Sequence, residues 1–312
     1  MDTIDANLQA VKARIEAAAK QCGRDAEGIE LLAVSKTFGA DAVRSAHGAG
    51  QCAFGENYVQ EAVEKIAALS ALPLIWHFIG PIQSNKTRQI AEHFDWVHSI
   101  DRLKIAERLA DARPAVRAPL QVCIQVNIGD ETSKSGVAPA DALELARAIS
   151  RLPRLALRGL MSIPPVSTDT SVQRGYFAQL RRLRDQIASQ VCPLDTLSMG
   201  MSADLEAAIA EGSTMVRVAA RVVFRRSRLT AWSRPDFQRG CRYVPFGRSA
   251  AGCLPASRRY DRRGRIRESK VQTYSSVFER ELLKLIDAKA QAILAELAAG
   301  YSITTIEVYR EK

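Results

Sequence analysis

Two patterns of apolar residues alternate along the first 218 positions of the chain. Short runs rich in β-branched residues, which are typical of strands buried on both faces, are separated by segments with apolar residues at helical spacing. The runs that predict strands are IELLAVSK (29–36), QCAFGEN (51–57), LIWHFIG (74–80), DWVHSI (95–100), LQVCIQVNI (120–128), LALRGLMSI (155–163), DTLSMGMS (195–202) and TMVRVA (214–219). The helical pattern occupies 41–50, 59–71, 85–94, 102–112, 139–150, 171–190 and 204–212.

Repeated strand-helix units predict an α/β protein with a parallel sheet, because parallel neighbours need a crossover connection and the crossover helices then cover the sheet. Eight such strands between residues 29 and 219 favour a closed (β/α)8 TIM barrel. An open doubly wound sheet is the alternative. It is less favoured, because no GxGxxG fingerprint follows the first strand.

Polar residues gather where the predicted strands end, and active sites of such barrels lie at the C-terminal ends of the strands. Lys36 ends the first strand, so its ammonium would lie at the barrel mouth above apolar walls. Burial there favours the neutral amine, which condenses with aldehydes, and pyridoxal 5'-phosphate (PLP) is the aldehyde most often held as a Schiff base. The other strand ends carry GENY (55–58), HFIGPIQSNK (77–86), VNIGDETSKSG (126–136), MSIPP (161–165), MGMS (199–202) and Arg217.

Six motifs in order give the chain a family resemblance. They are LLAVSKT, FGENYVQE, WHFIGPIQSNK, VNIGDETSKSGV, GLMSIPP and LSMGMSADLEAAIAEGSTMVRV. Together they resemble the pyridoxal-phosphate homeostasis protein family, which has the barrel fold of the alanine racemase N-terminal domain. The resemblance runs from about residue 5 to residue 218 and implies that Lys36 is the Schiff-base lysine.

The resemblance also suggests cofactor contacts beyond Lys36. In the related racemases an arginine of the last strand faces the pyridine nitrogen, and Arg217 is the matching residue here. Such an arginine keeps that nitrogen unprotonated and weakens the ring as an electron sink. Ser202, at the end of the seventh strand and before a predicted helix, is a candidate phosphate ligand. The alternative is that Ser202 only caps that helix.

Other residues at the mouth are weaker candidates. Asn57 and Tyr58 either contact the cofactor or shape the pocket wall, and His77 is either a cofactor contact or a hydrogen-bonded histidine of the barrel interior. Residues 134–136 form a loop that either approaches the cofactor or is solvated. The remaining histidines and the six cysteines lack metal-ligand spacing, so no metal site is predicted.

Racemisation needs a second base on the opposite face of the bound amino acid, and the racemases take it from an additional β domain. Nothing after residue 218 has the strand-and-turn alternation of such a domain. The resemblance therefore implies a PLP-binding protein that takes part in intracellular PLP homeostasis and amino-acid balance, without an established turnover reaction. The alternative is a PLP-dependent racemase or lyase. We expect a cytoplasmic monomer whose partners are PLP and PLP-dependent apoenzymes, and neither a membrane nor nucleic acid.

The charge distribution predicts a boundary near residue 218. Residues 1–218 carry 24 Lys+Arg against 25 Asp+Glu, whereas residues 219–270 carry 15 against 3, including 14 arginines. The predicted domains are thus a PLP-binding barrel (1–218), an Arg-rich irregular segment (219–270) and a helical tail (271–312). Ala219 and Ala220 stand where the family's phosphate-binding amides are expected. Alanine lacks glycine's access to positive φ, so a looser phosphate contact is expected.

Three interpretations of the Arg-rich segment compete. It binds nucleic acid or another polyanion, it is a disordered tail, or it is the translation of a shifted reading frame, which its composition favours. Residues 271–312 have a regular pattern again, with an amphipathic helix in SSVFERELLKLIDAKAQAILAELAAG that needs an apolar partner surface. A fusion by genomic rearrangement would explain both segments.

Overall fold

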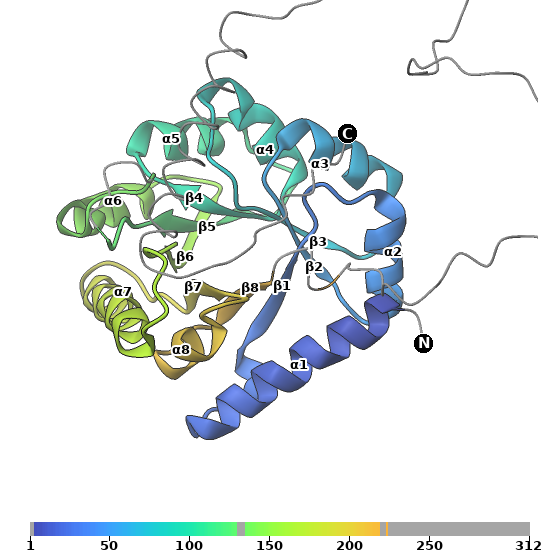
Figure 1. Ribbon diagram of the computed structural model, residues 1–312. Helices are drawn as coiled ribbons and strands as arrows, with labels where there is room; N and C mark the ends of the chain where they lie inside the picture. The colour runs from blue at the N-terminus through green and yellow to red at the C-terminus, as the bar shows by residue number, and fades with distance from the viewer. Residues whose placement is uncertain (1–2, 130–134, 219–222, 224–312) are drawn as a thin grey trace, which may run out of the picture. The chain divides into compact units, whose positions relative to one another are not determined.

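Eight parallel strands close into a barrel in the described part of the chain (Figure 1). The computed structural model describes residues 3–129, 135–218 and 223, all within the first of two units, 1–235 and 236–312. The predicted (β/α)8 barrel is confirmed and the open sheet is excluded, because β1 pairs with both β2 and β8. The strands are β1 (Glu30–Val34), β2 (Ala53–Glu56), β3 (Ile75–Phe78), β4 (Trp96–Ile100), β5 (Leu120–Gln125), β6 (Leu155–Met161), β7 (Thr196–Met201) and β8 (Met215–Val218).

Helices form the ring around the strands (Figure 1). The first helix, α1, precedes β1 and packs against α2 and α8, so it takes the place of a helix after β8. An ion pair of 2.5 Å between Arg14 and Glu206 joins α1 to α8. The ring is therefore complete within the described residues. The helices are α1 (Thr3–Gln21), α2 (Ala40–Gly48), α3 (Val59–Ala68), α4 (Thr87–His93), α5 (Leu103–Ala112), α6 (Ala142–Ile149), α7 (Thr170–Gln190) and α8 (Leu205–Ala210).

Alternation along the strands divides their side chains between two cores. Leu31 and Ala33 of β1 pack with the helices in the main apolar core. Leu32 packs with Ala53, Met215 and Ile79 in a small separate cluster, which alternation places on the inward face. The same alternation directs Lys36, four residues after Leu32, toward the interior at the C-terminal end of the barrel.

The strands and helices predicted between residues 29 and 219 are all present, and their ends differ by a few residues. Two helices predicted as continuous begin with short 3-10 turns, Ser84–Lys86 before α4 and Pro139–Asp141 before α6. None of the described helices is long and apolar enough to span a membrane. The predicted segments 219–270 and 271–312 lie outside the described residues, apart from Val223.

Candidate functional site

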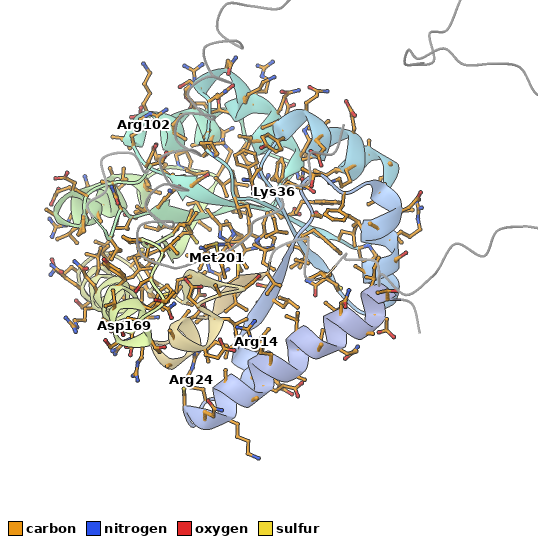
Figure 2. The ribbon with its side chains drawn as sticks, in the orientation of Figure 1. Arg14, Arg24, Lys36, Arg102, Asp169 and Met201 are labelled. Carbon is orange, nitrogen blue, oxygen red and sulfur yellow. The ribbon has the colours of Figure 1, made fainter. Side chains whose placement is uncertain are left out.

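Lys36 and Arg217 come from neighbouring strands at the C-terminal end of the barrel. Leu32 of β1 lies opposite Arg217 of β8 in the pairing register, and Lys36 follows β1 as a half-buried residue. Figure 2 places Lys36 and Met201 inside the ring of helices, whereas Arg102 and Asp169 lie on its outer side. The fold thus brings the predicted Schiff-base lysine and the predicted pyridine contact to the same end of the barrel.

Arg217 is a buried cation whose hydrogen-bond partners are neutral oxygens. Its Nη1 donates to the backbone oxygen and the hydroxyl of Ser198 at 2.5 and 2.8 Å, and its Nη2 donates to the backbone oxygen of Ser162 at 2.8 Å. It forms no ion pair with any described carboxylate. Burial lowers the pKa of Arg217 to about 10, so the guanidinium stays charged at neutral pH. The site therefore holds a fixed positive charge that no described carboxylate contacts directly.

A chain of hydrogen bonds runs from Arg217 across the barrel interior. The Ser198 hydroxyl lies 2.9 Å from His98 Nδ1, and His98 Nε2 lies 3.0 Å from His77 Nδ1. The guanidinium can only donate, so the Ser198 hydroxyl accepts from it, and we assign the hydroxyl proton to the bond with His98 Nδ1. His98 then carries its proton on Nε2 and donates to His77, whose remaining proton is on Nε2.

Both histidines are neutral in this arrangement. Burial lowers the pKa of His77 to about 3. The pKa of His98 is also well below its usual range, first because of burial and then because of the charges of its neighbours His77 and Arg217. His77 is a hydrogen-bonded residue of the barrel interior that also stacks on Trp96, with ring centroids 5.4 Å apart.

Three buried polar atoms near this network have no hydrogen-bond partner within the described residues. They are Asn57 Oδ1 after β2, Ser162 Oγ after β6 and His77 Nε2. The backbone of Asn57 packs tightly against Gly80, which follows β3. A Cβ added at Gly80 would lie only 2.3 Å from the Asn57 backbone oxygen. Buried polar atoms are normally satisfied, so these atoms indicate a place for a polar ligand.

Ser202 follows β7 as a half-buried residue. The helix after it starts at Leu205 with Asp204 at the N-cap position, so Ser202 lies two residues before the cap. The Asp204 carboxylate accepts a hydrogen bond of 2.5 Å from the Met201 N–H. Gly200 adopts a φ of +90° with Ala208 against its Cα, which fixes the path of the loop.

Two other site residues predicted from the sequence, Tyr58 and Ser135, do not take part in this hydrogen-bond network. Tyr58 is 58% exposed. Ser135 accepts a hydrogen bond from the Gln125 side chain through its backbone oxygen. Lys134 and the phosphate-loop candidates Ala219 and Ala220 lie outside the described residues. No group of three or more histidine, cysteine, aspartate or glutamate residues that could hold a metal ion occurs in the described part of the chain.

The prediction from sequence missed His98, Ser198 and Ser162. The sequence did contain a signal for His98 and Ser198. Strict alternation along β4 and β7 places both side chains on the inward face of the barrel, and it places His77 of β3 and Arg217 of β8 there as well. The hydrogen-bond chain itself depends on side-chain conformations in the folded barrel.

A barrel with a lysine after its first strand and a buried arginine in its last defines a class, the proteins with the barrel of the alanine racemase N-terminal domain. The family model described as "Alanine racemase, N-terminal domain" matches residues 6–219. Within this class, the chain belongs to the pyridoxal phosphate homeostasis protein family. It is 59% identical over 218 residues to the family protein of Pseudomonas aeruginosa, covering 70% of this chain and 94% of the relative. It is 54% identical over 221 residues to that of Escherichia coli, covering 70% and 94%.

Solved structures agree with this assignment. PipY of Synechococcus elongatus, in a structure with PLP bound, is 37% identical with a TM-score of 0.62, covering 71% of this chain and all of that one (100%). Alanine racemase from Corynebacterium glutamicum, at 15% identity and a TM-score of 0.52, covers 69% of this chain and 61% of its own. The racemase likeness shows the fold alone.

Proposed function

We propose that this chain binds PLP at the C-terminal mouth of its barrel and takes part in intracellular PLP homeostasis, with Lys36 as the covalent anchor. The observation that carries the proposal is the pairing of a half-buried lysine after β1 with a buried Arg217 in β8 that forms no ion pair with a described carboxylate. Membership of a family named for pyridoxal phosphate homeostasis supports it. PLP supplies an electrophilic aldehyde, an aromatic nitrogen and a phosphate dianion.

The residues present fit such a group. The buried Arg217 cation can donate to an aromatic nitrogen, and the orphaned Asn57 Oδ1 and Ser162 Oγ offer further polar contacts. Ser202 offers a hydroxyl to the phosphate. Because Arg217 stays protonated, it would keep a ring nitrogen that it contacts unprotonated, which reduces the capacity of the ring to accept electrons.

We further propose that the protein carries PLP without sustained turnover and passes it to PLP-dependent apoenzymes. Proton transfer at an amino-acid substrate needs a free base near the mouth. His98 uses both ring nitrogens in hydrogen bonds, and His77 lies fully buried. Neither histidine is therefore placed as a general base.

The central experiment identifies the residue that bonds to PLP. We expect cofactor-free protein incubated with PLP and reduced with borohydride to gain one pyridoxyl adduct per chain, mapped by peptide mass spectrometry to Lys36. Modification spread evenly over exposed lysines such as Lys20 and Lys104 would contradict the proposal, as would PLP that gel filtration removes entirely before reduction.

Turnover is tested separately with the PLP-loaded protein. We expect no D-isomer or cleavage product from L-alanine, L-serine or L-threonine after prolonged incubation, measured by chiral chromatography. Alanine racemase assayed in parallel is the positive control. Sustained product formation would instead establish the racemase or lyase alternative.

A further inference from the structure

Both peptide neighbours of Lys36 are held by side chains from other elements. The backbone oxygen of Ser35 accepts a hydrogen bond of 2.9 Å from Lys65 Nζ, and its hydroxyl donates to Glu56 Oε1 at 2.6 Å. On the other side, the N–H of Thr37 donates to Glu61 Oε1 at 2.8 Å. The backbone on each side of the proposed anchor is therefore fixed from β2 and α3.

These contacts converge on one ammonium group. Lys65 Nζ donates to Ser35 O, to Glu56 Oε1 at 2.5 Å and to Glu61 Oε1 at 3.1 Å, so each of its three protons has an acceptor. We call Ser35, Glu56, Glu61 and Lys65 the Lys65 brace. The side chains of Glu56 and Lys65 are 0% and 4% exposed. A buried ion pair often contributes less to stability than apolar residues of the same volume, so stability alone does not account for the brace.

The brace holds an unfavourable backbone conformation directly after Lys36. Thr37 has a φ of +69°, and it is one of only two described non-glycine residues with positive φ. Such a conformation persists where the surroundings determine it, and such residues cluster at functional sites. The Thr37 N–H is bonded to Glu61, so loss of that acceptor would let the turn relax and would shift Lys36.

We propose that Glu56, Glu61 and Lys65 are positioning residues that set the direction of the Lys36 amine at the barrel mouth. The proposal rests on the proposed PLP-anchoring role of Lys36 and adds to it. The brace acts through the backbone of residues 35–37, and its three ionisable members belong to the FGENYVQE motif and to α3. It explains why three ionisable side chains meet behind the strand that carries the anchor.

The test uses Glu61, because substitution of the fully buried Glu56 or Lys65 would endanger folding. E61A removes the acceptor of the Thr37 N–H, whereas E61Q keeps an oxygen acceptor without the charge. E64A is the matched control, because Glu64 lies on the same helix and bonds only to Gln60 among the hydrogen bonds of the described residues. We expect E61A to form the borohydride-reducible PLP adduct at least about tenfold more slowly than wild type, since small displacements of a reacting group have large rate effects.

Two further readouts separate positioning from stability. We expect E61Q to recover most of the rate and E64A to match wild type, with E61A melting within a few degrees of E64A. We also expect an amine-reactive reagent to label Lys36 of cofactor-free E61A faster than wild type, as the residue loses its restraint. Equal adduct rates in E61A and E64A would overturn the proposal.

Failure of the proposed function gives a different result. If wild-type protein forms no PLP adduct at Lys36, the anchoring role fails and the labelling of cofactor-free protein decides the brace alone. Equal labelling of Lys36 in wild type and E61A would then overturn the positioning role, and faster labelling in E61A would support it.

Discussion

A K36A variant is expected to hold no covalent PLP and to keep its fold. Alanine removes the only amine that the first strand presents at the barrel mouth, so the visible absorbance of the bound cofactor and the borohydride adduct should both disappear. Lys36 is not part of either apolar core cluster, and the brace contacts on its two sides involve Ser35 and Thr37. The free energy of unfolding of the cofactor-free protein should therefore change by less than about 1 kcal/mol.

K86A is the matched control for this prediction. Lys86 lies near the same end of the barrel and lines, with Asn57 and Tyr58, a pocket of about 370 Å³. We expect K86A to retain PLP like wild type, measured by absorbance after gel filtration and by the mass of the reduced protein. An adduct of equal yield in K36A, at whatever lysine, would show that the anchor is elsewhere.

The fold could be predicted from the sequence because its determinants are local and periodic. Eight β-branched runs separated by helical patterns leave few topologies, and the crossover rule for parallel strands favours the barrel. Strand ends were less predictable. Ser35 continues the ladder of β1 through a bond to the Gly55 oxygen, but Thr37 then turns with positive φ, and no pattern in LLAVSKT announces this turn.

Residues of the candidate site could be predicted only where a single residue type, at a single position, indicated a specific reaction or contact. Lys36 and Arg217 followed from their places at strand ends together with the family resemblance. The hydrogen-bond chain through Ser198 and His98 joins residues 100 positions apart. The brace joins β1 to the helix after β2. These contacts depend on the strand register and on side-chain rotamers, which are set by packing in the complete barrel. They could therefore not be predicted from individual residues in the sequence.

The neutral histidine pair predicts a steep loss of stability in mild acid. The pKa of His77 is lowered by burial to about 3 in the folded protein, against about 6.5 in an unfolded chain. Between these values the unfolded state binds one proton more than the folded state, so the stability present above pH 6.5 falls as the pH drops. The expected slope for His77 alone is about 1.4 kcal/mol per pH unit, or about 5 kcal/mol over the whole window.

The measurement is denaturant unfolding at a series of pH values between 6.5 and 4.5 for wild type and H77N. Asparagine offers an acceptor in place of Nδ1 but does not titrate, so the slope should decrease by about 1.4 kcal/mol per pH unit even if H77N is less stable at pH 7. I79V, a nearby apolar change in the barrel interior, should lower stability by about 1 kcal/mol without changing the slope. A wild-type slope in H77N would mean that His77 is not held neutral. The constraint comes first from burial, which lowers the pKa of both histidines, and the Arg217 cation in the same buried chain of hydrogen bonds further opposes a proton on His98. Burial and the fixed charge that suits Arg217 to contact an aromatic nitrogen therefore act together to make the barrel interior intolerant of acid.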